Sequence, residues 1–289
     1  MAGLSRLVQR LFSGARGTAF LSAHADDLCL ALHRAKLLFP RPHHLVTAFS
    51  RSSHVADEYV PRAHEDTAAT REDEDRQYAA AAEMRYAGLG FFDLPEIPQR
   101  SAAARTELLQ GIRGRLVALL RELKPEWVLV PLFWPESSRR HIHHALLCRA
   151  AIEALTTLKG PSLGFFDDLI YGRPSVETTI RCRGVDFIPF LIPLCDQELR
   201  SKISASHVYQ SQSPSRFVAE IMRPAPGGRG RVAEVVRVPR HCRIPPALEE
   251  FAGRDDGPVY ALPEPMPCSL AAPQDHQRLR INFLAELRL

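Results

Sequence analysis

The stretch TAFLSAHADD, residues 18–27, determines how this chain is expected to fold. Its first half, residues 18–22, is a short apolar run of the kind that forms a buried strand. Directly after that run come an imidazole and two carboxylates, His24, Asp26 and Asp27. Such groups can bind a divalent cation and still leave one carboxylate free to move a proton. The stretch therefore predicts a strand with a metal-hydrolase type of site at its carboxyl end.

A plainer explanation of these residues stays open. Asp26 or Asp27 could accept a hydrogen bond from a helix-start N–H, and His24 could be a half-buried histidine with satisfied partners. A second histidine cluster, His141-Ile142-His143-His144, opens another apolar helical run, and capping gives no reason for it. His141 and His144 are spaced i and i+3, so they share one helix face, and His143 is expected to point elsewhere.

Apolar runs and helical patterns alternate along the rest of the chain. Strands are predicted at 18–22, 44–49, 127–132 and 162–166, and helices at 65–89, 105–123, 142–158 and 196–210. This alternation predicts an α/β fold with a doubly wound, mostly parallel sheet, that is, a Rossmann-like architecture. Ligands gather at the carboxyl ends of strands in such folds. Both histidine clusters follow predicted strands, so the topology can bring them together.

Prolines become frequent after residue 212 and interrupt every long pattern of apolar residues that would indicate a helix or a strand. We therefore expect a core at 1–212 and a Pro-rich strand-and-loop extension at 213–289 that packs on it, with short strands near 232–238 and 259–262. At the other end, residues 4–12 form an amphipathic turn or two with arginines. A helix beside the first strand explains them more simply than a transit peptide does.

Composition narrows the class of protein further. With 289 residues and 45% hydrophobic content, the chain can bury a substantial core. No run approaches the ~20 apolar residues that a membrane span requires. Six cysteines are scattered without CxxC pairs, which favours reduced thiols and a cytoplasmic location. The net charge of +4 comes without a basic stripe interleaved with aromatics, so nucleic acid is not an expected partner. The oligomeric state is left open.

Five motifs stand in order along residues 18–212. They are SAHADD (22–27), TREDED (70–75) leading to AGLGFFDLP (87–95), RRHIHH (139–144), GFFDDLIY (164–171) and KISASHVYQSQ (202–212). Their order and spacing resemble the LmbE-like (PIG-L) family of N-acetylglucosaminyl deacetylases. The resemblance adds an expected activity to the expected fold.

The resemblance also implies roles for individual residues. His24, Asp27 and His144 match the metal ligands, and Asp26 matches the general base. His141 matches the histidine that polarises the amide carbonyl or protonates the leaving amine. Two further residues match substrate-contacting positions, namely Arg71 and Asp168, although Asp168 could equally cap the next turn. Lys202, Tyr209 and Gln212 match the last motif, with a polar helix end packed on the sheet as the plainer explanation.

The implied protein is a zinc-dependent N-deacetylase, with another divalent metal such as Fe²⁺ as an alternative. It would remove an acyl group, in the first place acetyl, from a small molecule that contains an amino sugar. Two departures from the family pattern favour an alternative, a catalytically weakened member that binds a sugar conjugate or a metal. His143 replaces an aspartate that could orient a neighbouring imidazole, and could itself act as a ligand. The stretch Leu30–Arg34 replaces glycines, which is expected to reshape the pocket. Hydrolysis of a non-sugar amide is a third possibility.

Overall fold

The computed structural model describes residues 16–61, 66–93, 101–132, 142–168, 179–212, 214–225, 232–240 and 281–282. Its centre is a nine-stranded sheet in the order β11-β8-β9-β10-β7-β6-β1-β2-β4. Five neighbouring strands of this sheet run parallel to one another, namely β1 (Thr18–Ser22), β2 (His43–Thr47), β4 (Met84–Gly88), β6 (Trp127–Leu132) and β7 (Ser162–Asp167). The predicted α/β fold with a mostly parallel sheet is therefore confirmed.

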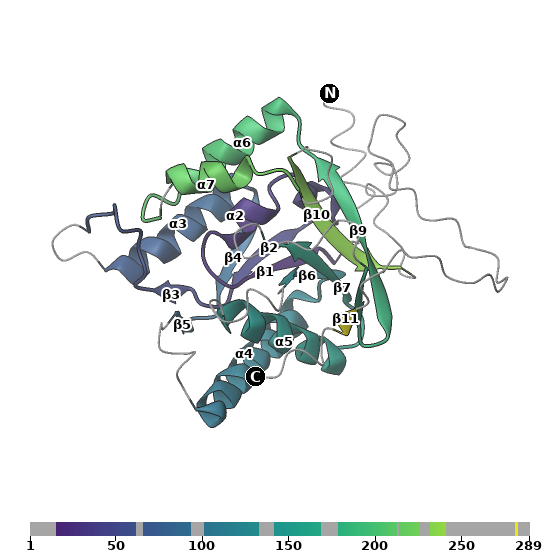
Figure 1. Ribbon diagram of the computed structural model, residues 1–289. Coiled ribbons are helices and arrows are strands. Elements are labelled where there is room, and N and C mark those ends of the chain that lie inside the picture. The colour runs from purple at the N-terminus through teal and green to yellow at the C-terminus, as the bar shows by residue number, and fades with distance from the viewer. Residues whose placement is uncertain are drawn as a thin grey trace.

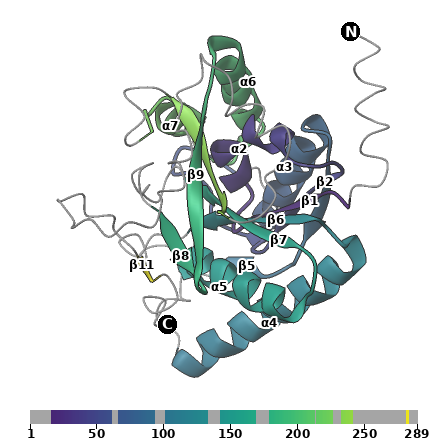
Figure 2. The same ribbon diagram turned by 90° about the vertical axis from the view of Figure 1, so that its right-hand side faces the viewer.

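Helices cover both faces of the sheet (Figures 1 and 2). One face carries α4 (Ala102–Leu123) and α5 (Ile142–Thr157). The opposite face carries α2 (Asp27–Ala31), the 3₁₀ turn η1 (Ala35–Leu38), α3 (Thr67–Ala81), α6 (Asp196–Ser206) and α7 (Pro214–Ile221). A separate parallel pair, β3 (Arg51–Ser52) and β5 (Phe92–Asp93), lies beyond the carboxyl ends of β2 and β4. Within the described residues, no helix is long and apolar enough to cross a membrane.

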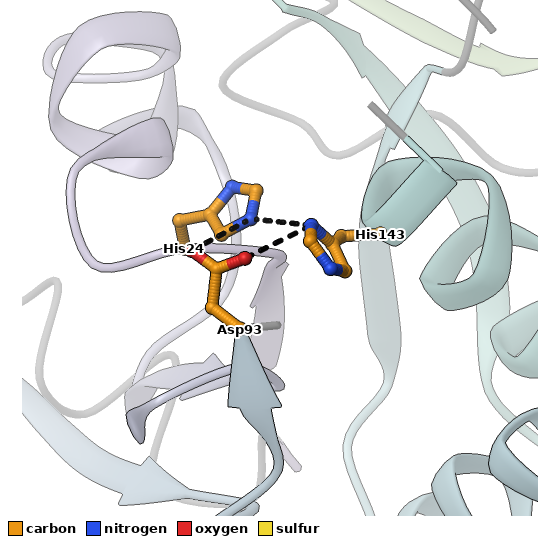
Figure 3. A group of neighbouring side chains, drawn as sticks. All are labelled: His24, Asp93 and His143. Carbon is orange, nitrogen blue, oxygen red and sulfur yellow. Dashed lines mark hydrogen bonds and ion pairs between the residues drawn. The ribbon is translucent and has the colours of Figure 1, made fainter. Parts of the chain in front are cut away.

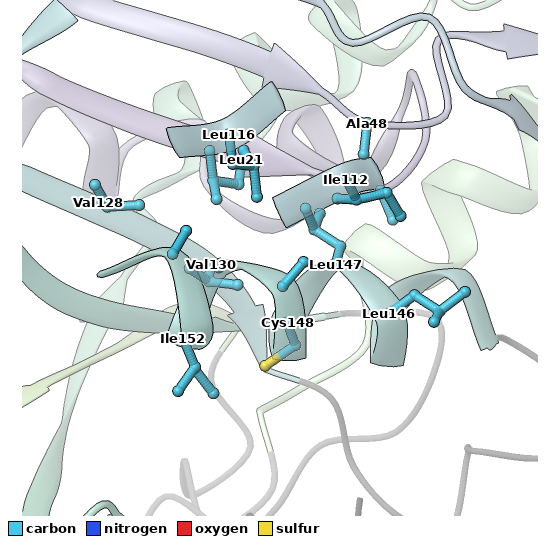
Figure 4. Packing of buried hydrophobic residues seen from close by; sticks show 14 of the residues in the cluster. Leu21, Ala48, Ile112, Leu116, Val128, Val130, Leu146, Leu147, Cys148 and Ile152 are labelled. Atoms are coloured by element: carbon cyan, nitrogen blue, oxygen red, sulfur yellow. The ribbon is translucent and has the colours of Figure 1, made fainter. Parts of the chain in front are cut away.

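The core forms because successive side chains of a strand point to opposite faces of the sheet. In β1, Leu21 belongs to the hydrophobic cluster under α4 and α5, whereas its neighbour Phe20 belongs to the cluster under α2, α3 and α6. In β6, Val128 and Leu129 divide between the same two clusters. Figure 4 shows part of the first cluster, with Leu21 of β1 beside Leu116 of α4. Both strands are thus buried on both faces, as their continuous apolar sequences predict.

The helix on residues 102–123 illustrates how the sequence sets the ends of an element. Ser101 caps α4 by accepting a hydrogen bond from the N–H of Ala104 at 3.2 Å. Lys124 ends the helix in the left-handed region, at φ 46°, and Pro125 cannot continue it. Between these ends, one apolar stripe is buried against α5 and the sheet, and it consists of Leu109, Ile112, Leu116 and Leu120.

The predicted single helix at 65–89 is wrong beyond residue 81. α3 ends at Ala81, Glu83 adopts a positive φ of 55°, and Met84–Gly88 form β4 beside β2. Polar and alanine-rich residues satisfy helix propensity throughout this stretch, but pairing with a buried parallel strand overrides a local propensity. The strands β8 (Ile180–Cys182) and β9 (Val185–Pro193), which lie between the strand predicted at 162–166 and the helix predicted at 196–210, were not predicted either.

Part of the Pro-rich segment enters the sheet itself. The strand predicted near 232–238 is confirmed as β10 (Ala233–Pro239), which lies antiparallel between β7 and β9. Residues 214–221 form a helix, α7, which was not predicted because the prolines of this segment were taken as helix breakers. Pro214 is the first residue of α7, where a proline gives up no hydrogen bond that the helix needs. The edge strand β11 (Ile281–Asn282) pairs with β8. The predicted strand at 259–262 and the expected helix near 4–12 lie outside the described residues.

β10 carries two fully buried charged side chains. The carboxylate of Glu234 lies 2.7 Å from the Lys202 ammonium and accepts hydrogen bonds from the backbone N–H groups of His33, Arg34 and Ala35. The guanidinium of Arg237 donates to both carboxylate oxygens of Asp167, at 2.8 and 3.0 Å. These contacts fix the segment after α2 and the end of β7, and the residue after β7, Asp168, contacts His144. They account for Lys202 as a structural residue.

Replacement of Arg237 by methionine is expected to lower the free energy of unfolding by roughly 3–5 kcal/mol, because it leaves Asp167 buried without its main partner. Urea denaturation followed by circular dichroism measures the change. Arg181→Met is the control, since Arg181 belongs to an exposed pair with Asp186 and should alter stability by less than about 1 kcal/mol. Equal effects of the two substitutions would show that the buried pair does not hold β10 in place.

Candidate metal centre and active site

The turn after β1 holds the first cluster of candidate site residues. The backbone N–H of His24 donates to the carboxylate of Asp27 at 2.7 Å, which fixes Asp27 at the start of α2. Asp26 occupies the position before that helix, but its side chain accepts no capping hydrogen bond. All three side chains are buried. The capping explanation therefore does not account for Asp26, whose carboxylate faces other partners.

The turn after β1 and the start of α5 meet at the carboxyl edge of the sheet. The Nδ1 atom of His24 lies 3.1 Å from Nε2 of His144. The Oδ2 atom of Asp27 lies 3.7 Å from the same His24 nitrogen and 3.6 Å from the same His144 nitrogen. β1 and β6 are neighbours in the sheet and the chain leaves them in opposite directions, so this edge is a topological switch point. The structure thus brings together the three residues that the sequence predicted as ligands.

The donor set of His24, Asp27 and His144 fits a divalent metal ion. Ligands at ~2.0–2.1 Å from a tetrahedral zinc ion lie ~3.3 Å from one another. The separations of 3.1, 3.6 and 3.7 Å agree with that spacing. Two imidazoles and one carboxylate form a common catalytic zinc shell that leaves a position open. These residues can therefore hold such an ion without rearrangement of the backbone.

Asp168 lies behind His144 and not beside the predicted ligand atoms. Its Oδ2 is 2.8 Å from Nδ1 of His144, and both side chains are buried. A carboxylate in this place fixes the ring orientation and leaves Nε2 as the nitrogen that faces Asp27. This geometry suggests an orienting role for Asp168 in place of the substrate contact implied by the sequence resemblance.

Arg71, on α3, is the cationic partner of Asp26. Its guanidinium lies 3.3 Å from Oδ1 of Asp26 and donates at 3.1 Å to the Ser52 hydroxyl and to the backbone carbonyl of His54. The side chain is buried, although α3 has no apolar stripe. α3 thus presents a polar face to the site, and its Arg71 holds the carboxylate that the sequence predicts as the general base.

The electrostatics of the cluster shift the pKa values of the adjacent Asp26 and Asp27 in opposite directions. Burial raises the pKa of Asp26, and Arg71 only partly opposes the shift. Burial would also raise the pKa of Asp27, but His144 and His24 outweigh it and hold that pKa well below its usual range. The pKa of His144 is raised to about 9, because Asp27 and Asp168 outweigh the effect of burial. Asp27 is thus held ionised, as a ligand must be, while Asp26 binds a proton more readily.

The cluster contains one more carboxylate, Asp93, which the sequence did not single out. Asp93, in β5, has its Oδ1 3.2 Å from Nδ1 of His143 and its Oδ2 3.7 Å from Nε2 of His24 (Figure 3). The Ser52 hydroxyl donates to the same carboxylate at 2.9 Å. His143 therefore points into the cluster, contrary to the expectation that it points elsewhere. Asp93 does stand in the motif AGLGFFDLP, but nothing local marks it as a site residue.

The other residues named from the sequence are placed as follows. His141 lies outside the described residues. Tyr209 donates to Asp75 at 2.9 Å, and the Gln212 amide donates to the His54 carbonyl at 3.2 Å. The first contact joins the segment after α6 to α3, and the second joins it to the loop that follows β3. They support the plainer explanation of the last motif, a polar helix end packed on its neighbours.

The fold and this cluster together define a doubly wound α/β protein with a histidine–aspartate site at its topological switch point. Comparisons with protein-family models and with curated proteins gave no match. Solved structures do match. The zinc-inhibited form of teicoplanin deacetylase Orf2 has a TM-score of 0.54 at 15% identity, over 78% of this chain and 99% of that one.

Two more solved structures agree with this result. The A40926 pseudoaglycone deacetylase Dbv21 has a TM-score of 0.52 at 18% identity, over 79% of this chain and 99% of that one. A deacetylase in complex with teicoplanin gives 0.53 at 16% identity, over 78% and 98%. The chain therefore shares the fold of these deacetylases, in agreement with the resemblance carried by its motifs.

Removal of the Asp168 carboxylate is expected to weaken metal binding. Because Asp168 orients His144, Asp168→Ala should raise the dissociation constant for Zn²⁺ about 10- to 100-fold. Competition against a chromophoric chelator measures the constant, with Asp73→Ala, an exposed carboxylate on α3, as the control. An unchanged constant would mean that His144 needs no orienting partner or is not a ligand.

Proposed function

We propose that this chain is a member of the LmbE-like (PIG-L) family and a zinc-dependent N-deacetylase that acts on a small molecule containing an amino sugar. The observation that carries the proposal is the group His24, Asp27 and His144, with the Arg71-paired carboxylate of Asp26 beside it, on a fold shared with deacetylases. Fe²⁺ is the alternative metal. The similar structures are deacetylases named for teicoplanin and for the A40926 pseudoaglycone, so the aglycone of this chain's substrate needs its own test.

The residues of the chain divide the work of amide hydrolysis. A divalent ion held by His24, Asp27 and His144 would supply a Lewis acid for the scissile carbonyl and lower the pKa of water. Asp26 takes a proton from the attacking water, because its carboxylate is buried, raised in pKa and not used as a helix cap. Arg71 keeps Asp26 in place. The proton for the departing nitrogen is assigned to His141, on the sequence resemblance alone.

The second candidate function is binding without efficient hydrolysis. One observation favours it: the stretch that replaces the family's glycines, at the end of α2 and just after it, has Leu30, Ala31 and Leu32 buried, and Glu234 fixes the residues that follow. The side chains of these residues fill space that the glycines of the family pattern leave open. Such a protein would keep its metal and a sugar conjugate but release no amine.

An amine-release screen separates the two functions. The protein is loaded with Zn²⁺ or with Fe²⁺ under exclusion of air, and then incubated with a series of N-acetylglucosaminyl conjugates. A primary amine and equimolar acetate are expected from at least one conjugate, and the metal-free protein should give neither. Bound metal with no amine from any conjugate, including N-acyl groups longer than acetyl, would favour the binding protein.

We also propose a cytoplasmic location. None of the cysteines in the described residues forms a disulfide, and three of them are buried, namely Cys29, Cys148 and Cys182. Thiols of this kind persist in a reducing compartment. Labelling of the protein in intact and in permeabilised cells tests the location.

A further inference from the structure

We propose that Asp93, His143 and the Nε2 atom of His24 form a second position for a divalent cation, alternative to the position formed by Asp27, His144 and the Nδ1 atom of His24. The two positions lie on opposite sides of one imidazole ring. The inference concerns metal binding only and does not depend on deacetylase activity.

The geometry of the second position matches that of the first. Nε2 of His24 lies 3.2 Å from Nδ1 of His143, which in turn lies 3.2 Å from Oδ1 of Asp93 (Figure 3). The other oxygen of Asp93 lies 3.7 Å from His24 Nε2. Tetrahedral zinc ligands are spaced by ~3.3 Å, so these three side chains also present their donor atoms at a suitable spacing. All three are buried or nearly so.

The environment of Asp93 supports its use as a ligand. The Ser52 hydroxyl donates to its Oδ2, and Ser52 in turn accepts from Arg71. Ligating carboxylates are usually held in this way by an outer partner. Phe49 packs against the His143 ring, with the ring centroids 4.4 Å apart, and limits the directions in which that ring can turn. The second position is therefore organised by contacts that the first does not use.

The two positions exclude each other because of the chemistry of imidazole. A neutral histidine has one ring nitrogen with a free lone pair and one that carries a proton. His24 can therefore bind a metal through Nδ1 or through Nε2, according to which tautomer it adopts. An ion at the second position takes His24 away from Asp27 and His144. The second position is thus a place where the chain can hold an ion while the first position is incomplete.

Zinc stoichiometry in variants tests the proposal. Equilibrium dialysis against Zn²⁺ followed by elemental analysis is applied to the wild type, His144→Leu, His143→Leu and the double variant His144→Leu with Asp93→Ala. The control is His44→Leu, a buried histidine of β2 outside both ligand groups. Circular dichroism establishes which variants fold. If His144→Leu does not fold, Asp27→Ala replaces it, because Asp27 belongs to the same ligand group.

We expect one Zn²⁺ per chain in the wild type, in the control and in each single variant, and none in the double variant. Anomalous scattering from crystals of His144→Leu should place the ion against Asp93 and His143. Loss of Zn²⁺ from folded His144→Leu would overturn the proposal, and two ions in the wild type would overturn the exclusion. Since binding is measured as metal content, an absence of amine release counts against the proposed function alone.

Discussion

Replacement of His24 by alanine is expected to leave the protein without bound Zn²⁺ and to reduce amide hydrolysis at least about 10³-fold. His24 is the one residue shared by both ligand groups of the described chain, so its loss takes a donor from each. A metal ion supplies several kcal/mol of charge stabilisation to the transition state of hydrolysis, and about 4 kcal/mol corresponds to 10³-fold in rate. Elemental analysis after dialysis and initial rates of amine release measure the two losses.

His44→Ala is the matched control for this experiment. His44 is also buried, but it lies on β2 and belongs to neither ligand group. It should keep its metal and its rate, so a loss caused by a cavity in the sheet can be told apart from a loss of a ligand. Zn²⁺ retained by folded His24→Ala in wild-type amount would disprove both metal positions.

The substitution Asp26→Asn is expected to preserve metal content and to lower the rate of hydrolysis by roughly 10²–10⁴-fold, the usual contribution of a general base. The amide has nearly the same shape as the carboxylate and can still meet Arg71, but it cannot take a proton from water. The rate is measured as kcat/KM for amine release, and metal content is measured on the same sample.

Asp73→Asn provides the comparison for Asp26→Asn. Asp73 is an exposed carboxylate on α3 that accepts a hydrogen bond from Gln77. Its replacement should leave both measurements unchanged. A wild-type rate in Asp26→Asn would transfer the base to another group, whereas loss of metal would show that Asp26 is a ligand.

The sequence predicted those parts of the molecule whose signals are local. β1 and β6 occupy the predicted ranges, because an apolar run bounded by polar residues has few alternatives to a buried strand. Helix α4 begins three residues before its prediction, since the capping serine was not used to set its start. The meeting of His24 with His144 followed from the rule that parallel strands gather ligands at one edge.

Non-local contacts set the limit of prediction. Asp93 comes to His143 through the pairing of β5 with β3, two strands of two residues each, and such short strands leave no period in the sequence. The position of His143 was misjudged because the spacing argument compares positions along one helix, whereas His143 reaches His24 and Asp93 on other elements at the first turn of α5. Asp168 pairs with His144 across neighbouring strand ends, a contact that chain order alone does not show.

The place of β10 in the sheet also bears on how the chain folds as it is synthesised. β10 is an inner strand, yet it is made after every other inner strand. Until residues 233–239 leave the ribosome, β7 presents an unpaired edge and Asp167 lacks its arginine. Exposed edges of this kind invite pairing with another chain. A nascent or truncated chain that ends before β10 is therefore expected to require a chaperone, and its histidine cluster to mature only once that strand has been inserted.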